Sequence, residues 1–146
     1  MTTPRAFVTA ACLGLALAAG CREVLAAGEV VPVVSARSAV TSLSAGQVAD
    51  LFLGKTVHFP DGSSAVPIDL PEQSQTRERF YAQYTGKSPS QVKAHWSKII
   101  FTGRGQPPMQ AATGLEAKRL IAANPNAIGY VDDALVDSSL RVVGAP

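Results

Sequence analysis

The chain has 146 residues, with 13 Lys and Arg against 11 Asp and Glu, which gives a formal net charge of +2 at pH 7. This length suits one domain, and the 47% share of hydrophobic residues excludes both a disordered chain and a polytopic membrane protein. The near-neutral charge balance lacks the basic excess of nucleic-acid-binding domains, so no nucleic-acid partner is expected.

Residues 1–26 are expected to form a removable signal peptide for export. Arg5 ends a short positive segment, and residues 6–19 form an apolar stretch that is too short to span a membrane comfortably. The two cysteines, Cys12 and Cys21, both lie in this leader, so no disulfide framework is expected in the domain that follows.

Two processing routes for this leader stay open, with retention as an anchor as a third. One is cleavage by signal peptidase after Ala26 or Ala27. The other is lipidation of Cys21, because residues 17–21 resemble a bacterial lipobox. Either route takes the domain at 27–146 out of the cytoplasm, as a periplasmic or secreted protein or as a membrane-anchored lipoprotein.

Four helices are predicted from the signals at their ends. Each begins with a Ser or Thr that can cap the first turn, and each ends at a Gly or at an Asn-Pro pair. The third helix is expected to bury Trp96, Ile99 and Ile100 along one stripe. The predicted helices, with their flanking residues, cover 44–54, 74–86, 88–103 and 113–125.

Four strands are predicted between these helices, in runs rich in β-branched residues. Alternation of strands with helices favours an α/β domain with a largely parallel sheet. Pro32 suggests that the first strand lies at an edge or begins there. The glycine- and proline-rich stretch 101–112 is the one long irregular segment, and functional residues are common in such loops. The predicted strands are 30–35, 65–69, 127–131 and 140–143.

No catalytic or metal-binding constellation can be assembled from the sequence. His58 and His95 have no partner at metal-ligand spacing, and the motifs of nucleophile elbows, Walker loops and dinucleotide-binding loops are absent from the sequence. The pair Asp132-Asp133 fits a solvated turn after a strand better than an acid or metal role. We therefore expect no enzyme, no metal and no cofactor.

One segment has a physical mechanism for binding an anion. A strand leads through a short loop into the helix that begins at Ser74. Backbone N–H groups of Ser74, Gln75 and Thr76, two side-chain hydroxyls and the charge of Arg77 would form an anion pocket there. Arg104 is a second candidate contact. The alternative is that Ser74 only caps the helix while Thr76 and Arg77 are solvated.

A helix ending in Phe-Leu-Gly at 52–54 precedes the 66–69 strand, the 74–77 turn and a strand reading Asn-Pro-Asn-Ala-Ile-Gly-Tyr-Val at 124–131. In this order the stretches resemble the phosphate-type periplasmic substrate-binding proteins of ABC transporters, over about residues 33–143. The resemblance implies one three-layer lobe of a type 2 periplasmic-binding-protein-like fold, with a mostly parallel sheet flanked by helices. It also implies export, no catalysis, oxyanion or inorganic phosphate binding at a helix N-terminus, and an ABC permease as partner.

The chain also departs from the family pattern. Full-length phosphate binders close two lobes on the ligand, whereas this chain resembles only the lobe that is inserted in mid-chain. Leu70 and Asp69 stand near the position where the family usually has Arg, and Gln75 stands where it has Gly. These departures concern the loop that would hold the anion.

Acidic residues in this loop leave a second class of function open. Asp69 and Glu72 place negative charge where a phosphate would lie, which lowers affinity unless Arg77 or Arg104 compensates. The alternative is a non-catalytic single-lobe interaction module of the cell envelope that has lost ligand binding. Such a module would dock on another envelope protein or form a homodimer.

Overall fold

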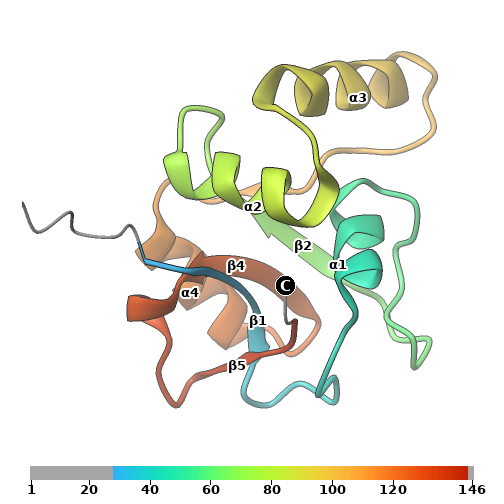
Figure 1. Ribbon diagram of the computed structural model, residues 1–146. Coiled ribbons are helices and arrows are strands. Elements are labelled where there is room, and N and C mark those ends of the chain that lie inside the picture. The colour runs from blue at the N-terminus through green and yellow to red at the C-terminus, as the bar shows by residue number, and fades with distance from the viewer. Residues whose placement is uncertain (1–27, 145–146) are drawn as a thin grey trace, which may run out of the picture.

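The computed structural model describes residues 28–144, in which five strands form one sheet with helices on both faces (Figure 1). The predicted signal peptide and Cys21 lie outside these residues. Within the described residues, no helix combines the length and the apolar character that a membrane span requires. The strands are β1 (Val30–Ser35), β2 (Val66–Asp69), β3 (Met109–Gln110), β4 (Ala127–Asp132) and β5 (Leu140–Val142). The helices are α1 (Ala45–Phe52), α2 (Gln75–Thr85), α3 (Pro89–Phe101), α4 (Gly114–Ala123) and a 3-10 turn at Asp133–Leu135.

Hydrogen bonds confirm the predicted helix ends. In α1 and α3 a Ser N-cap accepts from a backbone N–H three residues on, and the Gln there accepts from the backbone N–H of the Ser. The hydroxyl oxygens of Ser74 and Thr113 accept from the backbone N–H groups of Arg77 and Glu116. Gly86 ends α2 with φ 66°, a left-handed conformation that glycine adopts without steric cost.

The sheet is mixed, whereas the sequence predicts a mostly parallel one. In the strand order β3-β2-β4-β1-β5, β2 is parallel to both of its neighbours and β1 is antiparallel to both of its own. Pro32 therefore lies in an interior strand and not at an edge. An apolar run that is buried on both faces reads the same in either direction, so its local pattern does not reveal the pairing. The two residues of β3 lie in the stretch that the sequence assigns to a loop.

Alternate residues of β4 show which helices cover which face of the sheet. The ring of Tyr130 stacks on Phe80 of α2, with centroids 3.9 Å apart, and lies edge-on to Phe52 of α1 at 5.6 Å. Gly129 points to the other face, where a Cβ would collide with Ile121 of α4. Helices α1 and α2 thus cover one face and α4 the other, which is the predicted three-layer α/β lobe.

Helix α3 stands apart from the sheet, on the far side of α2 (Figure 1). It buries Val92 and Trp96, while Ile99 is half-buried. Ile100, which the sequence places on the same buried stripe, is 55% exposed. The Trp96 ring lies against Gly54 at the end of α1, so closely that a Cβ on Gly54 would be 2.6 Å from Cη2 of the indole.

Candidate functional site

The first turns of α2 and α4 open on one hollow of about 420 Å³. Ser74 and Thr76 line it from α2, and Thr113 and Gly114 line it from α4. The backbone N–H groups of the first two residues of each helix have no acceptor among the described residues. Two helix N-termini and their free N–H groups therefore make this wall of the hollow electropositive.

Asp132, at the end of β4, supplies a carboxylate to the same hollow. It accepts hydrogen bonds from Thr76 Oγ1 at 3.0 Å and from Arg79 Nη2 at 2.7 Å, and is not the freely solvated turn residue that the sequence suggests. Arg79 thus balances its charge. The hydroxyl hydrogen of Thr76 is committed to Asp132, whereas Ser74 only accepts, from the backbone of Arg77, and keeps its hydroxyl hydrogen to donate.

Arg77 does not line this hollow, contrary to the pocket that the sequence suggests. Its side chain is 9% exposed, and its Nε donates to Oδ2 of Asp69 at 3.2 Å. Asp69 also accepts from the hydroxyls of Tyr81 and Tyr130 and from the N–H of Leu70. Burial lowers the pKa of the Arg77 guanidinium, but Asp69, together with Tyr81 and Tyr130, outweighs this effect and the pKa is raised. The charge of Arg77 is therefore matched by Asp69.

The other two predicted contacts, Gln75 and Arg104, are both exposed. Gln75 is exposed at the first position of α2 and is not among the residues that line the hollow. Arg104 is exposed in the loop after α3 and borders a shallow hollow with Ile100 and Gly105. Of the five predicted contacts, Ser74 and Thr76 line the hollow, whereas Gln75, Arg77 and Arg104 do not.

Residues of α4 and Arg79 are the contributions that the sequence analysis missed. Thr113 is predicted as a helix cap, but its place beside α2 follows from the strand order, which no local pattern reveals. Arg79 had a local signal, because residues three apart on a helix are neighbours on its surface and Thr76 stands three residues before it. Within residues 28–144, no group of three His, Cys, Asp or Glu side chains could hold a metal ion.

Comparisons with known proteins point to one group of solved structures. No protein-family model matches the chain, and no curated protein does. A Clostridium perfringens protein described as a phosphate ABC transporter substrate-binding protein, with bound phosphate, superposes with a TM-score of 0.65 at 20% identity, over 80% of this chain and 44% of its own. A Vibrio cholerae ABC-type phosphate transport receptor gives 0.63 at 18% identity, over 80% and 45%. PstS from Borrelia burgdorferi gives 0.54 at 11%, over 80% and 47%.

These structures show the fold of this chain. It is the α/β fold of one lobe of the phosphate-type substrate-binding proteins, as the resemblance implies. The chain spans less than half the length of each of these proteins.

Proposed function

We propose that this chain is an exported solute-binding-like protein that binds phosphate or a similar oxyanion in the hollow between α2 and α4. It would act as part of, or as an accessory to, ABC-type phosphate transport, with an ABC permease as partner and without catalysis. The convergence of two helix N-termini on one hollow carries this proposal. The bound phosphate of the Clostridium perfringens protein supports the choice of ligand.

Asp132 gives the hollow a means to distinguish phosphate from sulfate. At neutral pH phosphate still carries a proton that it can donate to a carboxylate, whereas sulfate has none and would only be repelled. The arginine that contacts this carboxylate, Arg79, already pairs its charge with Asp132. We therefore expect selective but weak binding.

Thermal unfolding of the purified protein at fixed ionic strength tests this function. Phosphate is expected to raise the midpoint, while sulfate and chloride leave it unchanged. A ligand at about 100 times its dissociation constant stabilises the folded state by about 2.7 kcal/mol, a shift of several degrees for a chain of this size. One unfolding curve for all three salts would contradict the proposal.

A charge placed in the hollow provides the matched variant. Gln73 is exposed and lines the hollow, so Gln73→Glu would repel an anion there. The control is Gln91→Glu, which makes the same change in the first turn of α3 and keeps an acceptor for the Ser88 N–H. We expect Gln73→Glu to abolish the phosphate shift and Gln91→Glu to retain it.

A second function, the envelope interaction module, is favoured by apolar side chains around α3. Phe101 is 92% exposed, Ile100 55% and Met109 54%. A contiguous exposed apolar patch marks a site of contact with another protein, and Ile100 and Phe101 are adjacent at the end of α3. Sedimentation equilibrium of the protein and of Phe101→Ser distinguishes a homodimer from a module that docks on another envelope protein. A dimer that the substitution dissociates supports self-association. A monomeric parent protein rules self-association out, so that the partner would be a different protein.

A further inference from the structure

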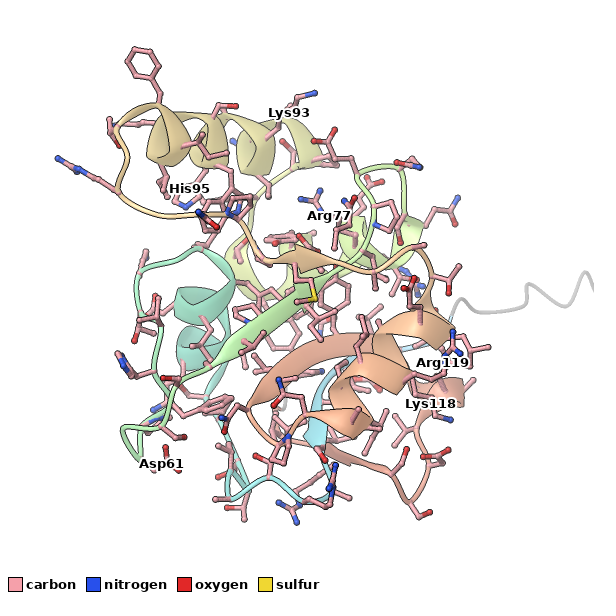
Figure 2. All side chains as sticks on the ribbon, turned by 180° about the vertical axis from the view of Figure 1, so that it is seen from behind. Asp61, Arg77, Lys93, His95, Lys118 and Arg119 are labelled. Carbon is pink, nitrogen blue, oxygen red and sulfur yellow. The ribbon has the colours of Figure 1, made fainter. Side chains whose placement is uncertain are left out.

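A second hollow, of about 310 Å³, lies between the start of α2 and helix α3, away from the proposed oxyanion site. Figure 2 shows the Arg77 side chain beneath α3, which carries Lys93. Arg77 and Lys93 both line this hollow, together with Trp96. The remaining lining residues are Asp69, Glu72, Ser97, Ile100, Pro107, Pro108 and Gln110.

Two buried side chains in the wall of this hollow hold hydrogen-bond donors without acceptors. The indole Nε1 of Trp96, a residue that is 7% exposed, has no partner among the described residues. The terminal Nη1 and Nη2 groups of Arg77, also 7% exposed as a residue, have none either, because its bond to Asp69 uses Nε. The Trp96 Nε1 is sealed from solvent, so a ligand that brings acceptor oxygens into the hollow would bond to the Arg77 Nη groups and lie against the Trp96 ring.

The charges around the hollow favour a negatively charged acceptor. The Asp69 carboxylate accepts hydrogen bonds from Arg77 and from three further donors, so its negative charge is well satisfied. At the rim, Glu72 pairs with Lys93 at 3.5 Å. The outer edge of the Arg77 guanidinium therefore remains the place where a carboxylate gains most, by a forked pair of hydrogen bonds.

The rest of the wall is apolar and suits an organic molecule better than an inorganic ion. Ile100, Pro107 and Pro108 line the hollow beside the Trp96 ring. Small-molecule sites commonly combine such apolar walls with a few polar groups that orient the ligand. An inorganic anion would leave this apolar surface in water.

We propose that the hollow between α2 and α3 binds a small organic carboxylate. Its oxygens accept from the Arg77 Nη groups, and its apolar body lies on the Trp96 ring, Pro107 and Pro108. This site is separate from the oxyanion hollow, so either can fail without the other.

Intrinsic fluorescence reports on this site directly, because Trp96 is the one tryptophan of the chain. The protein is titrated with benzoate, with uncharged benzamide and with phosphate at equal ionic strength. We expect a saturable change with benzoate alone. The absence of a benzoate response, an equal response to benzamide, or a response to phosphate would each overturn the proposal.

Substitutions then tie the response to the donors. Arg77→Lys keeps a cation beside Asp69 but removes the forked pair of donors. We expect it to weaken benzoate binding at least tenfold, because Lys replaces Arg poorly where a carboxylate is bound by two parallel hydrogen bonds. Arg104→Lys, at an exposed position outside the hollow, is expected to bind as the parent does. Unchanged affinity in Arg77→Lys would overturn the proposal.

A further variant covers the case in which Arg77→Lys does not fold. Ser97 is exposed and lines the hollow, so Ser97→Phe would fill it without disturbing the core. Ser90→Phe makes the same change on the exposed first turn of α3, outside the hollow. We expect loss of the benzoate response in the first and its retention in the second, and full affinity in Ser97→Phe would contradict the proposed site.

Discussion

Arg77 and Asp69 form an ion pair at 3.2 Å in which the side chains are 9% and 7% exposed, respectively. The two partners are unequally satisfied. Asp69 also accepts from Tyr81, Tyr130 and the N–H of Leu70, whereas Asp69 is the one acceptor of the Arg77 side chain among the described residues. Removal of Asp69 therefore leaves more groups without partners than removal of Arg77 does.

Substitutions of this pair are expected to differ in their cost. Asp69→Ala should lower the free energy of unfolding by about 3–5 kcal/mol, because it leaves a buried cation without its counterion and the hydroxyl hydrogens of Tyr81 and Tyr130 without an acceptor. Arg77→Met should cost less, since Asp69 keeps three donors. Urea unfolding followed by circular dichroism measures both, with exposed Arg104→Met as the control. A larger loss in Arg77→Met would contradict this account.

The tyrosines make stability fall at alkaline pH. Burial raises the pKa values of Tyr81 and Tyr130, and the neighbouring Asp69 charge raises them further. Burial also raises the pKa of Tyr84. Because these groups stay neutral in the folded state, their contribution is complete below about pH 10 and is lost as the pH rises beyond it, where the unfolded chain ionises.

A spectrophotometric titration tests this pH dependence. The chain has three tyrosines, all with raised pKa, so tyrosinate absorbance is expected to appear only together with the loss of the folded circular dichroism signal. Tyrosinate that forms while that signal is intact would show that at least one of these groups ionises in the folded state.

Gly54 is expected to tolerate no side chain, for two separable reasons. Its φ of 71° is left-handed, and a Cβ would meet the Trp96 ring at 2.6 Å. Gly103 has φ 67° with open space around it, so Gly103→Ala measures the backbone cost alone, about 1–2 kcal/mol. Gly54→Ala should cost a further 1–3 kcal/mol or so from overpacking. Thermal unfolding of the two variants compares them, and equal losses would rule out the steric contribution.

Gly129 allows α4 to lie close to the sheet, because a Cβ there would collide with Cδ1 of Ile121. We expect Gly129→Ala to cost about 1–3 kcal/mol. Ile121→Val removes Cδ1 and alone should cost about 0.5–1.5 kcal/mol. The double variant should lose less stability than the sum of the two single losses, since the atom that collides with the new Cβ is gone. Strict additivity in a denaturant-unfolding cycle would contradict the contact.

The parts of the fold that the sequence predicts well are local. The caps at Ser44, Ser74, Ser88 and Thr113 lie within three residues of the N–H groups that they accept from, so four consecutive residues reveal each of them. The end of α2 at Gly86 is local in the same sense. The helix boundaries, and the oxyanion hollow as far as α2 builds it, follow from such short stretches.

What the sequence does not reveal depends on long-range pairing. The direction of β1 is set by partners near the other end of the chain, and β3 exists because two residues of a loop meet β2. The position of Arg77 follows from the turn between β2 and α2, which brings the guanidinium to Asp69 at the end of the strand. The pattern of apolar residues within α2 carries no information on that turn. It therefore cannot show that Arg77 lines the hollow beside α3 while Ser74 and Thr76 line the other.

The position of β1 in the sheet also sets an order of folding. Among residues 28–144 it is the first strand to be synthesised, yet its ladder partners are β4 and β5, the last two strands of that range. Pairing of strands so far apart in the sequence has a large entropic cost of loop closure and is therefore slow. The apolar strand Val30–Ser35 therefore stays without its ladder partners until β4 and β5 have been synthesised.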